Sequence, residues 1–332
     1  MITGDPGAGP LRAPPRRLEG FTTMTTSTLD LSRPAPRIAP ETAIGPVALT
    51  VRDLDAVTRF YETVLGLVVQ HRTGDTVVLG AAGGVPLVVL LARPDAAPAP
   101  RRAAGLYHLA ILLPGRADLG RWLAHVAALR VPVQGAADHR VSEAVYLADP
   151  EGNGIEIYRD RPRPEWPFRG ARLVMENARL DFDGILDAAR AEGEEWSGAP
   201  PATRMGHVHL NVVDLEATRA FYDGVLGLDV MARMPSALFV AASGYHHHVG
   251  LNTWSAGGGS AREPADLGLA YALVELPGAD ALAALAGGLS DRGIGFERPL
   301  ADVIRLRDPS GNPLVFAVGP VDAVRAATIA TT

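Results

Sequence analysis

An internal repeat constrains the fold of this chain more than any other feature of its sequence. The segments GPVALTVRDLDAVTRFYETVLGL (45–67) and GHVHLNVVDLEATRAFYDGVLGL (206–228) align without a gap. Each begins with alternating apolar residues typical of a half-buried strand, and an aspartate, Asp53 or Asp214, then stands at the predicted N-cap of an amphipathic helix. The sequence therefore predicts that one structural unit occurs at least twice.

Two weaker repeats extend this pattern along the chain. GLYHLAILLPGRADLGRWLAHV (105–126) parallels GLAYALVELPGADALAALAGGL (268–289), and LADPEGNGIEIY (147–158) parallels LRDPSGNPLVFA (306–317). Turn-separated apolar runs follow each predicted helix, as strands do. We therefore expect four modules with the element order βαβββ and an α+β fold.

The repeats also divide the chain into regions. Residues 1–41 are rich in Pro, Gly, Arg and Ser and predict a disordered tail. Modules 1 and 2 occupy an N-terminal domain at 42–160, and modules 3 and 4 a C-terminal domain at 205–318. The segment 161–204 is expected to be a linker with one short helix, and 319–332 a tail.

The composition excludes several function classes. The net charge is −6 and no basic run carries interleaved aromatic residues, so nucleic acid is not an expected partner. No apolar run has the length of a membrane span, and a cytoplasmic protein is the expectation. Because the chain has no cysteine, only His, Asp and Glu are available for metal chemistry.

The motifs FYETVLGL and DPEGNGIE, with the fourfold repeat, resemble the vicinal oxygen chelate superfamily over residues 43–318. This family contains glyoxalases, bleomycin- and fosfomycin-resistance proteins and extradiol dioxygenases, and the chain resembles its two-domain catechol 2,3-dioxygenase-like members. The resemblance implies that paired modules form two cupped mixed sheets. It also implies a divalent metal held by the first and last strands of the modules.

The ligand positions of the family can be carried over module by module. On the first strands they fall, in order, on Pro46, His108, His207 and Tyr271, and on the last strands of modules 2 and 4 they fall on Glu156 and Val315. Only modules 2 and 3 together supply two histidines and a carboxylate, the set that leaves positions open on non-haem Fe(II). We therefore hypothesise that module 2 pairs with module 3, and module 1 with module 4. Domain-by-domain pairing with two incomplete sites is the alternative.

Three adjacent histidines, His246, His247 and His248, occur in GYHHHVGLN, which has the pattern of a strand. Alternation then places His246 and His248 on one face and His247 on the other. By resemblance to extradiol dioxygenases, His248 is the catalytic acid and base, and His247 is a packing or surface residue. A polar patch on an edge strand is the alternative. His209 shares a strand face with His207 and is a candidate neighbour or alternative ligand of the metal.

The segment DHRVSEAVYLADPEGNGIE (138–156) resembles the extradiol ring-cleavage signature. The resemblance implies that His139 and Tyr146 are catalytic residues that form hydrogen bonds with the oxygens of the substrate. Trp254, Phe239 and Met231 are candidate apolar walls of the site.

These features favour a metal-dependent extradiol dioxygenase that cleaves a small aromatic diol with O2. The expected cofactor is Fe(II), with Mn(II) as the alternative, and O2 is the co-substrate. A glyoxalase-like isomerase or lyase and a drug-binding protein without catalysis remain open. The sequence is compatible with a homo-oligomer and does not define its size.

Overall fold

The computed structural model describes residues 37–332 except 171 and 264–265. Residues 1–36, which make up most of the predicted disordered tail, lie outside the described part. Within the described ranges, no helix has both the length and the apolar character to span a membrane.

All four modules have the predicted element order, a strand and a helix followed by three strands. Module 1 contains β1 (Ala43–Val51), α1 (Leu54–Leu65), β2 (Val68–Thr73), β3 (Thr76–Gly80) and β4 (Pro86–Ala92). Module 2 contains β5 (Gly105–Leu112), α2 (Arg116–Ala128), β6 (Gly135–Asp138), β7 (Ser142–Ala148) and β8 (Gly154–Asp160). Module 3 contains β11 (Arg204–Asn211), α4 (Leu215–Tyr222), β12 (Asp229–Met234), β13 (Ala237–Ala241) and β14 (Val249–Asn252). Module 4 contains β15 (Gly268–Leu276), α5 (Ala279–Asp291), β16 (Glu297–Leu300), β17 (Val303–Arg307) and β18 (Pro313–Val318).

The aspartates of the repeat cap the helices as the sequence predicts. The Asp53 side chain accepts a hydrogen bond from the backbone N–H of Ala56, and Asp214 accepts one from Ala217. These bonds satisfy donors that the first turn of a helix leaves free. Gly66 ends α1 in the left-handed region with φ of 65°, a conformation that glycine adopts without strain.

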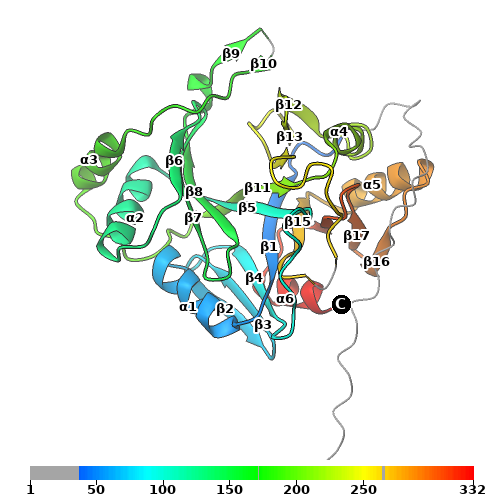
Figure 1. The fold of residues 1–332 in the computed structure, drawn as a ribbon, viewed down its shortest axis with the longest axis horizontal. Helices are drawn as coiled ribbons and strands as arrows, with labels where there is room; N and C mark the ends of the chain where they lie inside the picture. Colours follow the sequence, from blue (N-terminus) through cyan, green and yellow to red (C-terminus); the bar gives the residue numbers. More distant parts are fainter. Residues whose placement is uncertain (1–36, 171, 264–265) are drawn as a thin grey trace, which may run out of the picture.

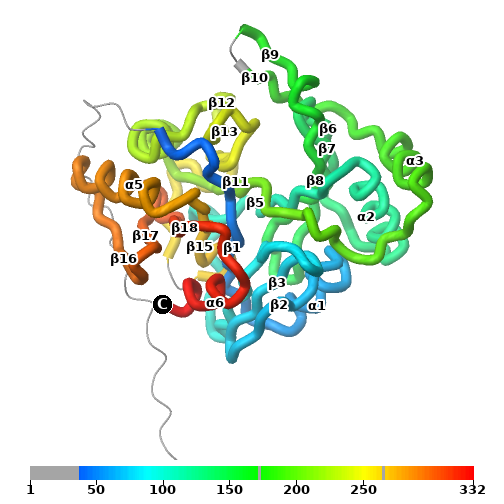
Figure 2. The backbone as a smooth tube through the Cα atoms, turned by 180° about the vertical axis from the view of Figure 1, so that it is seen from behind, coloured from blue at the N-terminus to red at the C-terminus, as the bar shows by residue number. Residues whose placement is uncertain are grey.

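The modules pair across the two halves of the chain. One eight-stranded sheet has the order β12-β13-β14-β11-β5-β8-β7-β6 and joins modules 3 and 2. The other has the order β16-β17-β18-β15-β1-β4-β3-β2 and joins modules 4 and 1. Figures 1 and 2 show α1 and α2 on one side of the molecule and α4 and α5 on the other. The hypothesis that module 2 pairs with module 3 is confirmed, so each sheet draws on both predicted domains.

The segment 161–204 contains more structure than a linker with one helix. It forms η1 (Arg163–Glu165), the short hairpin of β9 (Phe168–Arg169) and β10 (Arg172–Leu173), and α3 (Phe182–Glu192). Figure 1 shows the hairpin projecting from the upper end of the molecule and α3 lying beside α2. The backbone of Ala178 then exchanges two hydrogen bonds with that of Asp138 at the end of β6. The segment is therefore tied to the sheet of modules 2 and 3.

The expected tail at 319–332 is instead mostly helical. Helix α6 (Ala323–Thr331) begins at Asp322, whose side chain caps it, and its apolar face packs on the sheet of modules 1 and 4. Tyr271 and Val315, which stand where module 2 has His108 and Glu156, belong to this apolar cluster. The tail interpretation was wrong because a short alanine-rich segment gains its stability from this tertiary contact, which a local pattern does not reveal.

Candidate metal centre

Three side chains from neighbouring strands converge at the middle of the sheet of modules 2 and 3. The Nε2 atom of His108 on β5 lies 2.9 Å from Oε2 of Glu156 on β8, and the Nε2 atom of His207 on β11 lies 3.0 Å from the same oxygen. The ligand atoms of all three residues lie within 4.8 Å of one another. The antiparallel pairing of β5 with β11 and the parallel pairing of β5 with β8 produce this convergence.

These three side chains are almost completely buried, with exposed fractions of 5% for His108, 2% for Glu156 and 1% for His207. Burial alone would raise the pKa of Glu156, but the adjacent histidines outweigh it and hold that pKa well below its usual value. Burial also lowers the pKa of His207 to about 4. At neutral pH the site therefore presents one carboxylate and an unprotonated His207 imidazole, the forms that bind metals.

The donor set fits a divalent metal ion. His207 is aligned to hydrogen-bond with Glu156, whereas the buried Nε2 of His108 has no hydrogen-bond partner although it lies close to the same oxygen. A buried polar atom without a partner costs free energy, and a shared cation would satisfy all three groups. Two imidazoles and one carboxylate from three strands can hold one face of an octahedral ion and leave other positions free.

The three residues open into a cavity of about 220 Å³. Polar groups next to them in its wall are His139, Tyr146, His209 and His247. Tyr146, on β7, pairs directly across the sheet with Glu156, and its hydroxyl lies 2.6 Å from Nε2 of His139. Burial and the charge of Glu156 raise the pKa of Tyr146 well above 10, so the phenol stays protonated. Both predicted residues thus line the candidate site.

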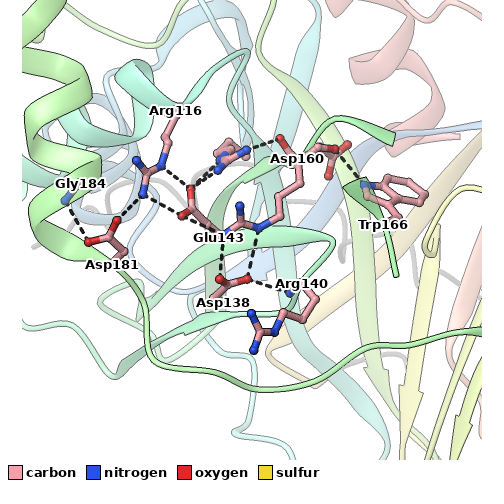
Figure 3. Close-up of polar contacts among 10 residues, drawn as sticks. Arg116, Asp138, Arg140, Glu143, Asp160, Trp166, Asp181 and Gly184 are labelled. Carbon is pink, nitrogen blue, oxygen red and sulfur yellow. Dashed lines mark hydrogen bonds and ion pairs between the residues drawn. The ribbon is translucent and has the colours of Figure 1, made fainter. Parts of the chain in front are cut away.

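A network of ion pairs (Figure 3) begins at the residue that precedes His139 in the sequence. This residue, Asp138, accepts hydrogen bonds from the Arg140 backbone N–H at 2.8 Å and from the Arg161 guanidinium at 2.7 Å. Arg161 also reaches Glu143, which is fully buried. These bonds fix the turn between β6 and β7 in which Arg140 has the left-handed φ of 68°.

Glu143 is the centre of this network. Arg116 of α2 donates to both of its oxygens at 2.9 and 3.1 Å, and Arg159 of β8 donates at 2.6 Å. Arg116 also binds Asp181, the N-cap residue of α3. The network therefore joins the helix of the linker to β8, which carries Glu156, and to the turn that carries His139.

The histidine triplet departs from the prediction, because it is not part of a strand. The regular strand β14 begins only at Val249, and the preceding loop contains left-handed residues at Ser243 and Gly244. Strand alternation therefore does not extend back through the triplet. His247 faces the metal cavity, with its ring centroid 4.0 Å from that of His207.

His248, the predicted acid and base, does not line this cavity. Its Nδ1 accepts a hydrogen bond from the backbone of Ala242, and its ring lies among the core residues Val208 and Tyr222. Burial lowers its pKa to about 4. The structure therefore places His247, and not His248, in the wall of the metal cavity.

His246 connects His247 to Asp160 through hydrogen bonds. The Nδ1 atoms of the two rings lie 2.8 Å apart, and Nε2 of His246 lies 2.9 Å from Oδ1 of Asp160. Since a carboxylate accepts only, His246 donates to Asp160 through Nε2 and accepts through Nδ1. His247 must then donate through Nδ1, which leaves its Nε2 as the unprotonated nitrogen.

His209 also lines the cavity but does not belong to the group of ligand atoms. Its Nε2 is buried without a hydrogen-bond partner. The His209 ring lies against Gly250, its pairing partner on β14. A Cβ atom added at Gly250 would lie only 2.9 Å from this ring, so the glycine leaves the space that the ring occupies.

The apolar wall differs in part from the prediction. Phe239 and Trp254 line the cavity as expected, but Met231 lies in a separate cavity and Met234, further along β12, takes the expected place. Other lining residues that the sequence reasoning missed are Tyr107, Ala137, Met175 and Asn177. The last two come from the linker, whose sequence carries no motif that indicates a role in the site.

Comparison with known proteins places this architecture in a family. The model of the glyoxalase/bleomycin resistance protein/dioxygenase superfamily matches residues 43–157 and 204–316. The chain belongs to this superfamily. A catechol-2,3-dioxygenase of Bacillus subtilis (strain 168) is 40% identical to this chain over 283 residues, which cover 84% of this chain and 98% of that protein.

Solved structures of the superfamily share the fold. A putative dioxygenase from Bacillus subtilis superposes with a TM-score of 0.60 at 15% identity, covering 86% of this chain and 87% of its own. Glyoxalase I from Zea mays superposes with a TM-score of 0.54 at 15% identity, covering 87% of this chain and 95% of its own. At these identities the likeness concerns the fold alone. The predicted α+β fold of four βαβββ modules is thereby confirmed.

Proposed function

We propose that this protein is an extradiol dioxygenase that cleaves a catechol-type diol with O2 at the site of His108, His207 and Glu156. The observation that carries the proposal is that two imidazoles and one carboxylate meet in the wall of a cavity that also contains His247, Tyr146 and His139. The similarity to a protein named catechol-2,3-dioxygenase supports the same reaction.

The three ligands would hold Fe(II), or Mn(II) as the alternative. When bound, the ion supplies open positions for both diol oxygens and for O2, together with the electronic coupling between them. In the overall reaction both atoms of O2 enter the product, one ring carbon–carbon bond beside the diol breaks, and the ring is oxidised as O2 is reduced. No further oxidant is needed.

The surrounding side chains handle protons and position the substrate. A diol that binds through its oxygens must lose a proton, and the unprotonated Nε2 of His247 is the group in the cavity wall that can take it and return it. The protonated phenol of Tyr146, which hydrogen-bonds with His139, can donate to a substrate oxygen. Burial of the wall limits water, which strengthens each of these interactions.

A glyoxalase-like isomerase has less support. Such enzymes commonly use a fourth protein ligand, and within the described ranges only three His, Asp or Glu residues form the group around Glu156. The cavity is lined by aromatic rings, with two phenols and several neutral imidazoles. Such a wall suits a planar aromatic diol better than a flexible substrate.

The proposal is tested with protein reconstituted anaerobically with Fe(II) and mixed with catechol and oxygenated buffer. We expect one O2 to be consumed for each diol and the absorbance of a ring-opened product to appear. Tight Fe(II) binding without oxygen uptake for any catechol would refute the reaction and favour a redox-neutral enzyme or a binding protein.

A further inference from the structure

The cavity wall divides into two parts, and the second part has no role in the chemistry proposed above. The polar part surrounds Glu156, as described. The other part is formed by Met175 and Asn177 of the linker, Met234 and Phe239 of module 3, and Trp254. We infer that this second part binds the ring substituent of the substrate, and that it selects catechols with an uncharged, apolar substituent over catechols that carry a carboxylate. The inference rests on the proposed function.

The linker reaches the site beside the end of β6. Ala178 exchanges backbone hydrogen bonds with Asp138, which holds the residues before it next to the cavity. Met175 and Asn177 line the metal cavity, although Met175 also borders a second cavity, whereas Val174 and Glu176 line other cavities only. The segment between the two halves of the chain is thus a wall of the site.

Aromatic side chains form another stretch of this wall. Trp254 donates through its indole N–H to Ser236 at 3.0 Å, and its ring packs edge-on against Tyr107 with centroids 5.1 Å apart. Phe239 packs against His209 with centroids 5.7 Å apart. Apolar and aromatic surfaces of this kind gain free energy from burying an alkyl or aryl group.

No arginine or lysine occurs among the described residues that line this cavity. Two arginines adjoin lining residues in the sequence, Arg140 after His139 and Arg233 before Met234. Both line other cavities, and Arg233 forms an ion pair with Glu216. A substrate carboxylate would therefore meet neutral groups such as the Asn177 amide and no cation, and removing an anion from water without a cation is costly.

The charge balance of the loaded site leads to the same conclusion. A divalent cation, the Glu156 carboxylate and a diol that has lost one proton sum to zero net charge. A carboxylate on the ring substituent would add a negative charge to a wall that offers no compensation. An apolar substituent leaves the balance unchanged and can pack against the apolar side chains of the wall.

Equilibrium binding under anaerobic conditions tests this inference without relying on turnover. Protein loaded with Zn(II) is titrated by calorimetry with 4-propylcatechol and with 3,4-dihydroxyphenylacetate, two diols of similar size. We expect 4-propylcatechol to bind about tenfold more tightly or better. Equal dissociation constants, or tighter binding of the acid, would overturn the inference.

A charge-insertion variant tests the placement of the substituent. Asn177→Arg puts a guanidinium into the wall that can form two hydrogen bonds with a carboxylate. We therefore expect the ratio of the two dissociation constants to fall by about tenfold, or the preference for 4-propylcatechol to reverse. Glu176→Gln changes the net charge by the same amount one residue away, outside the cavity, and should leave this ratio unchanged. An unchanged ratio in Asn177→Arg would overturn the placement.

Oxygen uptake with unsubstituted catechol, measured in parallel on the Fe(II) protein, separates the two proposals. Uptake without binding selectivity overturns the inference and leaves the proposed function intact. Selectivity without uptake overturns the proposed function and leaves the inference about the wall intact. Failure of both diols to bind overturns both.

Discussion

His207 lies 3.0 Å from Glu156 although the two residues come from opposite halves of the chain. This contact exists because β11 of module 3 and β8 of module 2 both flank β5 in one sheet. Neither half holds a complete ligand set by itself. Both halves therefore contribute to the candidate metal site.

We expect Glu156→Gln and His207→Ala each to weaken metal binding by more than about a hundredfold, since even residues that only support a ligand commonly account for 10- to 100-fold. Competition dialysis against a chelator measures this. Tyr271→Phe, at the position equivalent to His108 in the other sheet, is the control. Its hydroxyl has no hydrogen-bond partner, so metal affinity should not change. A large loss of metal in Tyr271→Phe would place a functional site in the sheet of modules 1 and 4.

Substitutions of His247 and of His248 should differ in their effect on oxygen uptake. His247→Gln is expected to lower the rate of oxygen uptake by about a hundredfold or more with metal retained, as loss of a general base does. His248→Gln should stay within a few-fold of the parent, because His248 does not line the metal cavity. The reverse ranking would show that His248 reaches the substrate after all.

The stability of the metal-free protein should depend on pH through these histidines. Burial lowers the pKa of His248 from 6.5 to about 4, so the unfolded chain binds a proton between these values and the folded chain does not. The stabilisation from His248 is therefore complete above pH 6.5 and is lost as the pH falls towards 4. From pH 7 to pH 5 this amounts to about 2 kcal/mol of unfolding free energy.

Urea unfolding of the parent and of His248→Gln at both pH values checks this estimate. The variant should lose less stability than the parent on acidification. His207, His209 and His247 shift in the same direction, and the raised pKa of about 6 at Asp308 acts in the opposite one, but all four are common to both proteins. Identical losses in both proteins would contradict the burial argument.

Glu143→Gln should destabilise the fold without changing the metal ligands. Removing the charge of a fully buried carboxylate leaves Arg159 without its counter-ion and takes one of two acidic partners from Arg116, a change that commonly costs about 3–5 kcal/mol. Urea unfolding measures the loss, and Glu176→Gln on the surface should cost almost nothing. A neutral Glu143→Gln would mean that the arginines find other partners.

The sequence was sufficient to predict the modules, their pairing and the three convergent side chains. A repeat reports the element order directly, and the uneven distribution of His108, Glu156 and His207 among the modules indicated which of them share a sheet. The ligand positions themselves came from the resemblance to the superfamily and were carried over onto each repeated unit.

The errors arose where a position depends on a loop or on a distant contact. The orientation of His247 follows from left-handed turns at Ser243 and Gly244, and alternation cannot be applied outside a strand. Met175 and Asn177 reach the site because the linker pairs with Asp138. Helix α6 depends on an apolar face supplied by residues far away in the sequence.

The most direct test of the central claim is the structure of the product formed from catechol by the Fe(II) protein, determined by mass spectrometry and carbon NMR. Cleavage beside the diol gives a ring-opened product with one aldehyde and one carboxylate, which contains both oxygen atoms of O2, and this is the expected result. A dicarboxylic acid from cleavage between the hydroxyls, or recovery of unchanged catechol from protein with iron at His108, Glu156 and His207, would contradict it.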